Sequence, residues 1–96
     1  MTHYIALIHK DSDSSYGVSF PDVPGVIAAA GTLDEALAEA AGALAFAAEG
    51  WEEDTGKAFP QPRKLDDLRA DPDFTQRAVD AVVAAIPFKI QAEAAE

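Results

Sequence analysis

The sequence predicts an α+β fold, in which a small antiparallel sheet carries one main helix on one face. Three short apolar segments rich in β-forming residues follow one another near the start, separated by turn residues, and this is typical of a strand meander. A longer segment then repeats large apolar residues at helical spacing. A chain of 96 residues is long enough for one domain built from these elements.

The first two strands are expected to form a hairpin. Tyr4–His9 is a short apolar run of β-forming residues, and Tyr16–Phe20 is a second segment with alternating character. The residues between them, 10–15, are mostly Asp and Ser, whose side chains favour turns because they hydrogen-bond to the nearby backbone. The second strand therefore returns antiparallel to the first.

A loop and a third strand complete the meander. Pro21–Gly25 ends the second strand because its two prolines lack amide donors and its glycine permits a positive φ. The apolar segment Val26–Ala30 then predicts a third strand beside the other two.

The main helix has the clearest local signal. Thr32 followed three residues later by Glu35 forms a capping box, which predicts that the helix begins at Leu33 and runs to about Trp51. Gly42 lies in the middle of this helix, at a cost of about 1 kcal/mol relative to alanine. The large apolar residues of the buried stripe are Leu33, Leu37, Leu44 and Trp51.

The C-terminal third is less regular. Phe59–Pro62 is expected to be extended, and Leu65–Ala70 allows a short helix that ends before the following Asp-Pro pair. Residues 78–90 fit either a helical stripe or a buried strand, and periodicity alone leaves both open. Residues 91–96 are rich in Ala and Glu and are expected to be a frayed tail.

The first strand is apolar on both sides, which predicts association. Ile5 and Leu7 point to one face, while Tyr4 and Ile8 point to the other. One helix covers only one face, so the second needs the C-terminal segment, another subunit or a partner, and we expect a homodimer or higher homo-oligomer. The expected core comprises Tyr4, Ile5, Leu7, Ile8, Val18, Phe20, Ile27, Leu33, Leu37, Leu44, Trp51, Val83 and Ile86.

The charge is strongly negative and uneven. Seventeen acidic residues against seven basic ones give a net charge of −10, and residues 32–58 alone hold seven acids and one base. Binding to nucleic acid requires Lys and Arg to neutralise phosphates, so this chain is not expected to bind nucleic acid by itself. Such acidity keeps a surface soluble, and it also attracts a basic protein.

No residue pattern indicates an enzyme, a metal or a cofactor. The absence of cysteine excludes disulfides, a thiol nucleophile and a cysteine-based zinc site, and it is typical of a cytoplasmic protein. His3 and His9 would lie about 20 Å apart on one strand, too far to share a ligand. Asp11 and Asp13 lack the glycine and terminal glutamate of a calcium loop. No apolar run suits a membrane span, and no secretory signal is visible.

In order and spacing, several segments together resemble the HicB-like antitoxin family of toxin–antitoxin systems. The resemblance covers roughly residues 3–75, and its C-terminal part rests on the Pro60-x-Pro62 motif and Leu65. The longer matching segments are Tyr4-Ile5-Ala6-Leu7-Ile8-His9-Lys10-Asp11, Tyr16-Gly17-Val18-Ser19-Phe20-Pro21-Asp22-Val23-Pro24-Gly25 and Gly31-Thr32-Leu33-Asp34-Glu35-Ala36-Leu37.

This resemblance implies a fold and a partner. The fold would be β-β-β-α-β, a partial RNase H-like arrangement, with residues 1–90 as the antitoxin domain and 78–88 as a late strand. The partner would be a basic HicA-like toxin, an mRNA interferase, whose RNA-binding surface and catalytic histidine the antitoxin masks. The expected toxin contacts, chosen for exposure and charge, are Phe20, Asp22, Pro24, Gly25, Asp34, Glu35 and Glu39.

The sequence departs from the family pattern in two ways. Val26 stands where the family commonly has cysteine, and the chain ends where a ribbon-helix-helix or helix-turn-helix unit would begin, so no DNA-binding domain is expected. Two other functions remain as alternatives. One is a stand-alone interaction domain without a toxin, which the absence of a short basic reading frame next to the gene would favour. The other is a metal-dependent nuclease, which the negative charge and the lack of a recognisable carboxylate set disfavour.

Overall fold

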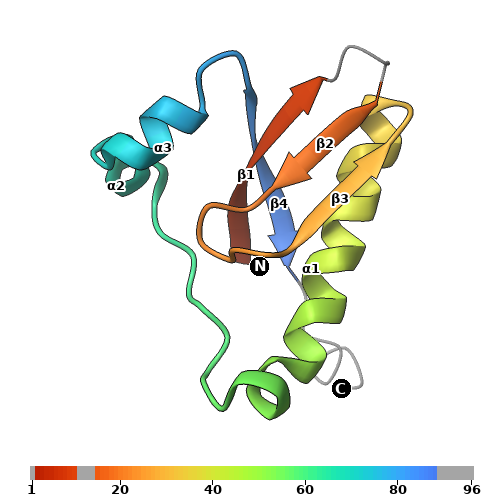
Figure 1. Cartoon of the computed structure of the whole chain (residues 1–96), viewed down its shortest axis with the longest axis vertical. Coiled ribbons are helices and arrows are strands. Elements are labelled where there is room, and N and C mark those ends of the chain that lie inside the picture. Colours follow the sequence, from red (N-terminus) through yellow and green to blue (C-terminus); the bar gives the residue numbers. More distant parts are fainter. Residues whose placement is uncertain (1, 11–14, 89–96) are drawn as a thin grey trace.

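The computed structural model describes residues 2–10 and 15–88, and within them four strands form one antiparallel sheet in the order β3-β2-β1-β4 (Figure 1). β1 pairs with β2, with Ile8 opposite Val18, so the predicted hairpin is confirmed. The predicted α+β class with a mainly antiparallel sheet is confirmed as well. The strands are β1 (Thr2–Lys10), β2 (Tyr16–Ser19), β3 (Ile27–Ala30) and β4 (Val82–Phe88).

The segment that fitted either a helix or a strand forms β4. It pairs with β1 from Thr2 opposite Phe88 to Ile8 opposite Val82. A strand is favoured over a helix here because β1 offers seven register partners, and the ladder satisfies backbone groups along the whole segment. The strand begins later than residue 78, because residues 78–80 form a turn that ends at Asp80 with a φ of 66°.

Helix α1 (Leu33–Thr55) covers one face of the sheet (Figure 1). It begins at the predicted capping box and continues four residues past Trp51 to Thr55, after which Gly56, with a φ of 74°, ends the helix. The N–H of Gly56 donates to the carbonyl of Glu52 at 2.8 Å. The buried residues between helix and sheet are Tyr4, Ala6, Ile8, Val18, Phe20, Val23, Val26, Ala36, Ala40, Leu44 and Ile86.

The chain itself covers part of the second face. Helices α2 (Leu65–Arg69) and α3 (Pro72–Arg77) lie on the side of the sheet away from α1 (Figure 1). Leu68 and Phe74 from these helices pack against Leu7 of β1 in a separate small core. The apolar character of β1 on both sides is therefore explained by two cores on opposite faces of one strand.

Helix α3 was not predicted from the sequence, because the Asp-Pro pair predicts only the end of the preceding helix. In the structure the same pair begins the next one. Asp71 caps α3 by accepting a hydrogen bond from the N–H of Asp73 at 2.9 Å, and Pro72 occupies the first turn, where a missing amide donor costs nothing.

Four aromatic rings close the end of α1 against the sheet. Trp51 and Phe59 meet edge to face with centroids 5.3 Å apart, and Tyr4 and Phe88 do so at 5.4 Å. The Tyr4 hydroxyl donates to the carbonyl of Pro60 at 2.6 Å, which fixes the extended segment predicted there. Burial, and then the nearby charge of Asp22, raise the pKa of Tyr4.

Several members of the predicted core are exposed. Ile27 is 72% exposed, and Leu33 and Val83 are also accessible to solvent. Ile27 and Val83 lie on the face away from α1, where α2 and α3 cover little of the sheet, and Leu33 is the first residue of the helix. The predicted tail, 91–96, lies outside the described residues. Within the described residues, no helix is long and apolar enough to cross a membrane.

Candidate functional site

The predicted contact residues of α1 lie in its first two turns and are exposed. Thr32 Oγ1 accepts a hydrogen bond from the N–H of Glu35 at 3.1 Å and donates one to Glu35 Oε1 at the same distance. Asp34 and Glu35 occupy the first turn, where the positive end of the helix dipole stabilises carboxylates. Glu39 lies one turn further along and is exposed. These carboxylates make the start of α1 strongly negative.

The predicted loop contacts divide into a buried and an exposed part. The loop from Phe20 to Val26 is folded by two backbone hydrogen bonds, from Val23 N to Phe20 O at 3.2 Å and from Val26 N to Val23 O at 3.3 Å. All three side chains are buried in the main core. Pro24 and Gly25 are exposed, and Gly25 has a φ of 94°, which favours glycine there. The loop therefore presents its tip to solvent.

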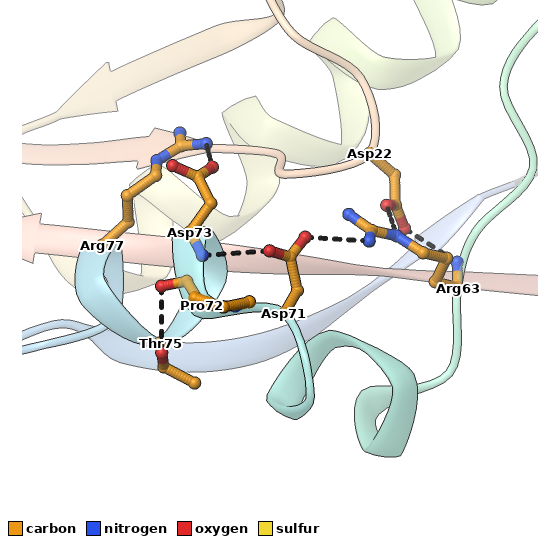
Figure 2. A network of polar contacts seen from close by, with 7 residues as sticks. All are labelled: Asp22, Arg63, Asp71, Pro72, Asp73, Thr75 and Arg77. Carbon is orange, nitrogen blue, oxygen red and sulfur yellow. Dashed lines mark hydrogen bonds and ion pairs between the residues drawn. The ribbon is translucent and has the colours of Figure 1, made fainter.

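The carboxylate of Asp22 points toward Arg63 (Figure 2). The Asp22 side chain is only 6% exposed. Asp22 Oδ2 accepts from the backbone N–H of Arg63 at 2.7 Å, and Asp22 Oδ1 accepts from Arg63 Nε at 2.6 Å. Arg63 Nη1 donates to Asp71 Oδ2 at 3.1 Å. This network joins the 20–26 loop to the extended segment before α2 and to the start of α3.

The structure does not bring the predicted contacts into one patch. Phe20 is 2% exposed and lies in the core, where the sequence also placed it, so it does not present its side chain at the surface. The exposure expected for Asp22 is wrong, because its carboxylate faces Arg63. The exposed members lie at opposite ends of β3, the loop tip before Ile27 and the helix start after Ala30 (Figure 1). They are Pro24 and Gly25 at one end and Asp34, Glu35 and Glu39 at the other.

Sequence reasoning missed two exposed apolar features. Phe46 is 78% exposed in the middle of α1. Val82 and Val83 are exposed at the start of the edge strand β4, and Val79 is exposed in the turn before it. Phe46 could have been found, because it falls outside the helical stripe of Leu37, Leu44 and Trp51 and on the side of Glu39. The exposure of β4 depends on its place at the sheet edge, which the sequence alone does not reveal.

The two histidines do not form a site together. His9 Nε2 lies 3.1 Å from the carbonyl oxygen of Arg77, while His3 is exposed six residues earlier on the same strand. The contact of His9 joins β1 to the end of α3. No group of three or more His, Asp or Glu side chains able to hold a metal ion is found within residues 2–10 and 15–88.

We expect Asp22→Ala to lower the free energy of unfolding by about 2 kcal/mol, because it removes two hydrogen bonds to a charged, nearly buried acceptor and leaves the amide of Arg63 unpaired. Urea unfolding followed by circular dichroism measures this. The matched control is Asp66→Ala, at an exposed carboxylate of α2, with an expected change within about 0.5 kcal/mol. An equal loss of unfolding free energy in the two variants would contradict a structural role for Asp22.

The charge of Asp71 should contribute stability that depends on pH. Hydrogen bonds from Arg63 and then from the amide of Asp73 lower the pKa of Asp71 in the folded state. A lowered pKa means that the contribution is complete above the unfolded value, about 3.9, and is lost as the pH falls through the folded value. Asp71→Asn keeps a capping side chain but not the charge. At neutral pH the variant should therefore have a lower free energy of unfolding in urea than the wild type. That difference should vanish in acid, and a difference that persists below the folded pKa would contradict it.

The family model and the solved structures that match this chain point to one kind of relative. A family model described as the HicB_like antitoxin of bacterial toxin–antitoxin systems matches residues 4–95. The crystal structure of the N-terminal domain of the antitoxin HicB of Burkholderia pseudomallei is 27% identical, with a TM-score of 0.73 over 93% of this chain and 100% of that one. No match is found among curated proteins.

Two further solved structures share the fold. The longer B. pseudomallei HicB is 28% identical with a TM-score of 0.70, and the alignment covers 93% of this chain but only 63% of that one. A chain in the HicA3 and HicB3 toxin–antitoxin complex is 20% identical with a TM-score of 0.70, and the alignment covers 92% of this chain and 99% of that one.

Proposed function

Because this chain belongs to the HicB-like antitoxin family of bacterial toxin–antitoxin systems, we propose that it binds a small basic HicA-like mRNA interferase and neutralises it by masking its RNA-binding surface and catalytic histidine. The chain contributes a binding surface and no chemistry to this reaction. The solved HicA3 and HicB3 complex, one chain of which shares the fold, supports a protein partner of this type. The place of action would be the cytoplasm, where the toxin meets mRNA.

The observation that carries this proposal is the position of the negative charge. Residues 32–58 hold seven acids and one base, and nearly all of this segment is helix α1. The sheet covers the apolar side of α1, so its acidic side faces solvent. A toxin that binds RNA carries positive charge on its RNA-binding surface. The same positive surface would be attracted to α1, and a docked antitoxin would then exclude RNA.

Co-expression tests the proposal directly. The toxin should arrest bacterial growth when expressed alone, and co-expression of this chain should restore growth and give a complex that purifies together. RNA added to the purified complex should stay intact, whereas the free toxin cuts it. If growth stays arrested and no complex forms, the proposal is wrong, and a stand-alone interaction domain becomes the better account.

We also propose self-association through the outer edge of β4. No strand of the described residues pairs with this edge, and the seven residues of β4 carry no charge. Pro87 is tolerated in a strand where its nitrogen faces away from the neighbour, so Ala85 and Val83, two and four residues earlier, direct their N–H groups outward. Pairing with a second copy would satisfy these groups and cover exposed valines.

Sedimentation equilibrium at several concentrations tests this edge. The wild-type chain should form a dimer, and Val83→Lys should shift it to monomer because a charge on an edge strand opposes pairing. The matched control is Ile27→Lys on β3, the edge strand at the other side of the sheet, which should leave the dimer intact. A wild-type chain that stays monomeric, or a dimer lost only in the Ile27 variant, would refute the proposed edge.

A further inference from the structure

Helix α1 carries an exposed aromatic side chain that belongs to neither hydrophobic core. Phe46 is 78% exposed and lies on the side of α1 away from the sheet. A phenylalanine in this position adds nothing to the core, and an isolated large apolar residue on a helix surface exposes most of its ring to water. Its position in the centre of the acidic helix side makes it a candidate anchor for a partner.

Two glycines flank Phe46 at the spacing of one helical turn. Gly42 precedes it by four residues and Gly50 follows it by four, so all three share one side of α1. A glycine inside a helix costs about 1 kcal/mol relative to alanine. A Cβ added at Gly42 would meet nothing within 4 Å, and one at Gly50 would meet only the Asp54 side chain at 3.4 Å. Packing within this chain therefore does not require either glycine.

The surface around Phe46 is shaped by these glycines. Each missing side chain leaves a notch beside the protruding ring, and the notch at Gly50 belongs to a shallow depression. The depression is lined by Phe46, Ala47, Glu49, Gly50, Glu53 and Asp54. A partner could approach the helix backbone closely on both sides of the ring, as close packing at glycine permits.

Carboxylates surround the ring on the same side of the helix. Glu39 precedes Gly42 by three residues, and Glu49 and Glu53 follow Phe46 by three and seven, so they border the ring along α1. A second copy of this chain would bring the same carboxylates against each other, which is unfavourable. The fitting occupant is a basic surface with an apolar socket for one aromatic ring and with Lys or Arg side chains around that socket.

We propose that Phe46, seated between Gly42 and Gly50, is the anchor by which α1 docks into an apolar socket on a basic partner protein. The partner is the toxin, so this inference rests on the proposed function. Buried aromatic residues at the centre of an interface commonly dominate its affinity, while charged residues at the rim set the association rate. Phe46 and its bordering carboxylates have this arrangement.

The experiment measures binding of a catalytically inactive cognate toxin by isothermal titration calorimetry. Phe46→Ala should weaken the affinity at least about tenfold. The free variant should unfold at an unchanged or higher temperature, because Phe46 is not in the core and alanine favours helix. The matched control is Ile27→Ala, which removes another exposed apolar side chain on the sheet and should leave affinity unchanged.

A second variant separates docking from folding. Gly42→Leu fills the notch, so it should raise the unfolding temperature of the free chain and yet weaken binding of the toxin. If the wild type binds the toxin and both variants bind equally well, this inference is overturned and the proposed function stands. If the wild type does not bind at all, both fail. If Phe46→Ala instead changes the sedimentation of this chain in the absence of toxin, the side of α1 that carries Phe46 is a self-association surface. The inference is then overturned.

Discussion

Phe20→Ala should lower the free energy of unfolding by about 3–5 kcal/mol. The side chain of Phe20 is 2% exposed and packs in the main core between the sheet and α1. Its removal leaves a cavity at the point where β2 enters the loop, and Val23 and Val26 of that loop lose a neighbour in the same cluster. A domain of this size has a total stability of about 5–15 kcal/mol, so this one truncation removes a large share of it.

Thermal unfolding followed by circular dichroism measures the effect, with an expected fall in Tm of more than about 12 °C. The control is Ile27→Ala, seven residues later on β3, where the side chain is 72% exposed and the change should be within about 0.5 kcal/mol. Both residues belong to the core predicted from sequence. Comparing the two variants therefore tests whether Phe20 is buried and Ile27 is exposed, as in the structure. Similar losses in the two variants would show that Ile27 is covered in solution.

Glu39→Lys should slow association with the basic toxin about tenfold at low salt. Glu39 is exposed in the second turn of α1, beyond the capping box, so its replacement leaves the bonds between Thr32 and Glu35 in place. The reversal weakens the negative potential that attracts a basic partner during encounter. The effect should shrink as salt rises, because the screening length falls to about 10 Å at 0.1 M.

Stopped-flow measurement of the association rate over a range of salt concentrations checks this prediction. Asp66→Lys is the matched control, because it makes the same change in net charge on α2, on the other side of the sheet. We expect it to slow association much less than Glu39→Lys. Equal slowing by both would mean that overall charge governs encounter and that α1 has no special position.

The features that the sequence predicted well are local. The capping box of Thr32 and Glu35 defined the start of α1, because a helix N-terminus needs an acceptor at that position and the partner lies three residues away. The hairpin was defined in the same way by alternating residues around a polar turn. In both, the side chains that decide the structure are neighbours in sequence.

The features that the sequence predicted poorly depend on contacts between segments far apart in the chain. Asp22 looked like an exposed acid, but its partner Arg63 is 41 residues away. Ile27 looked like a core residue because β3 is apolar, and whether it is buried depends on how far α2 and α3 extend over the sheet. Helix and strand could not be separated by periodicity for β4, since the free edge of β1 decides the outcome.

The central position of β1 also has a consequence for synthesis on the ribosome. β1 is made first and β4 last, yet the two are neighbours in the sheet, with Thr2 opposite Phe88. The nascent chain can form its hairpin early, but one edge of β1 stays open until β4 has left the exit tunnel. Contacts between segments so far apart in sequence form slowly, because a long loop must close first. The unfinished chain therefore passes through a stage in which proteases and chaperones can reach its first strand.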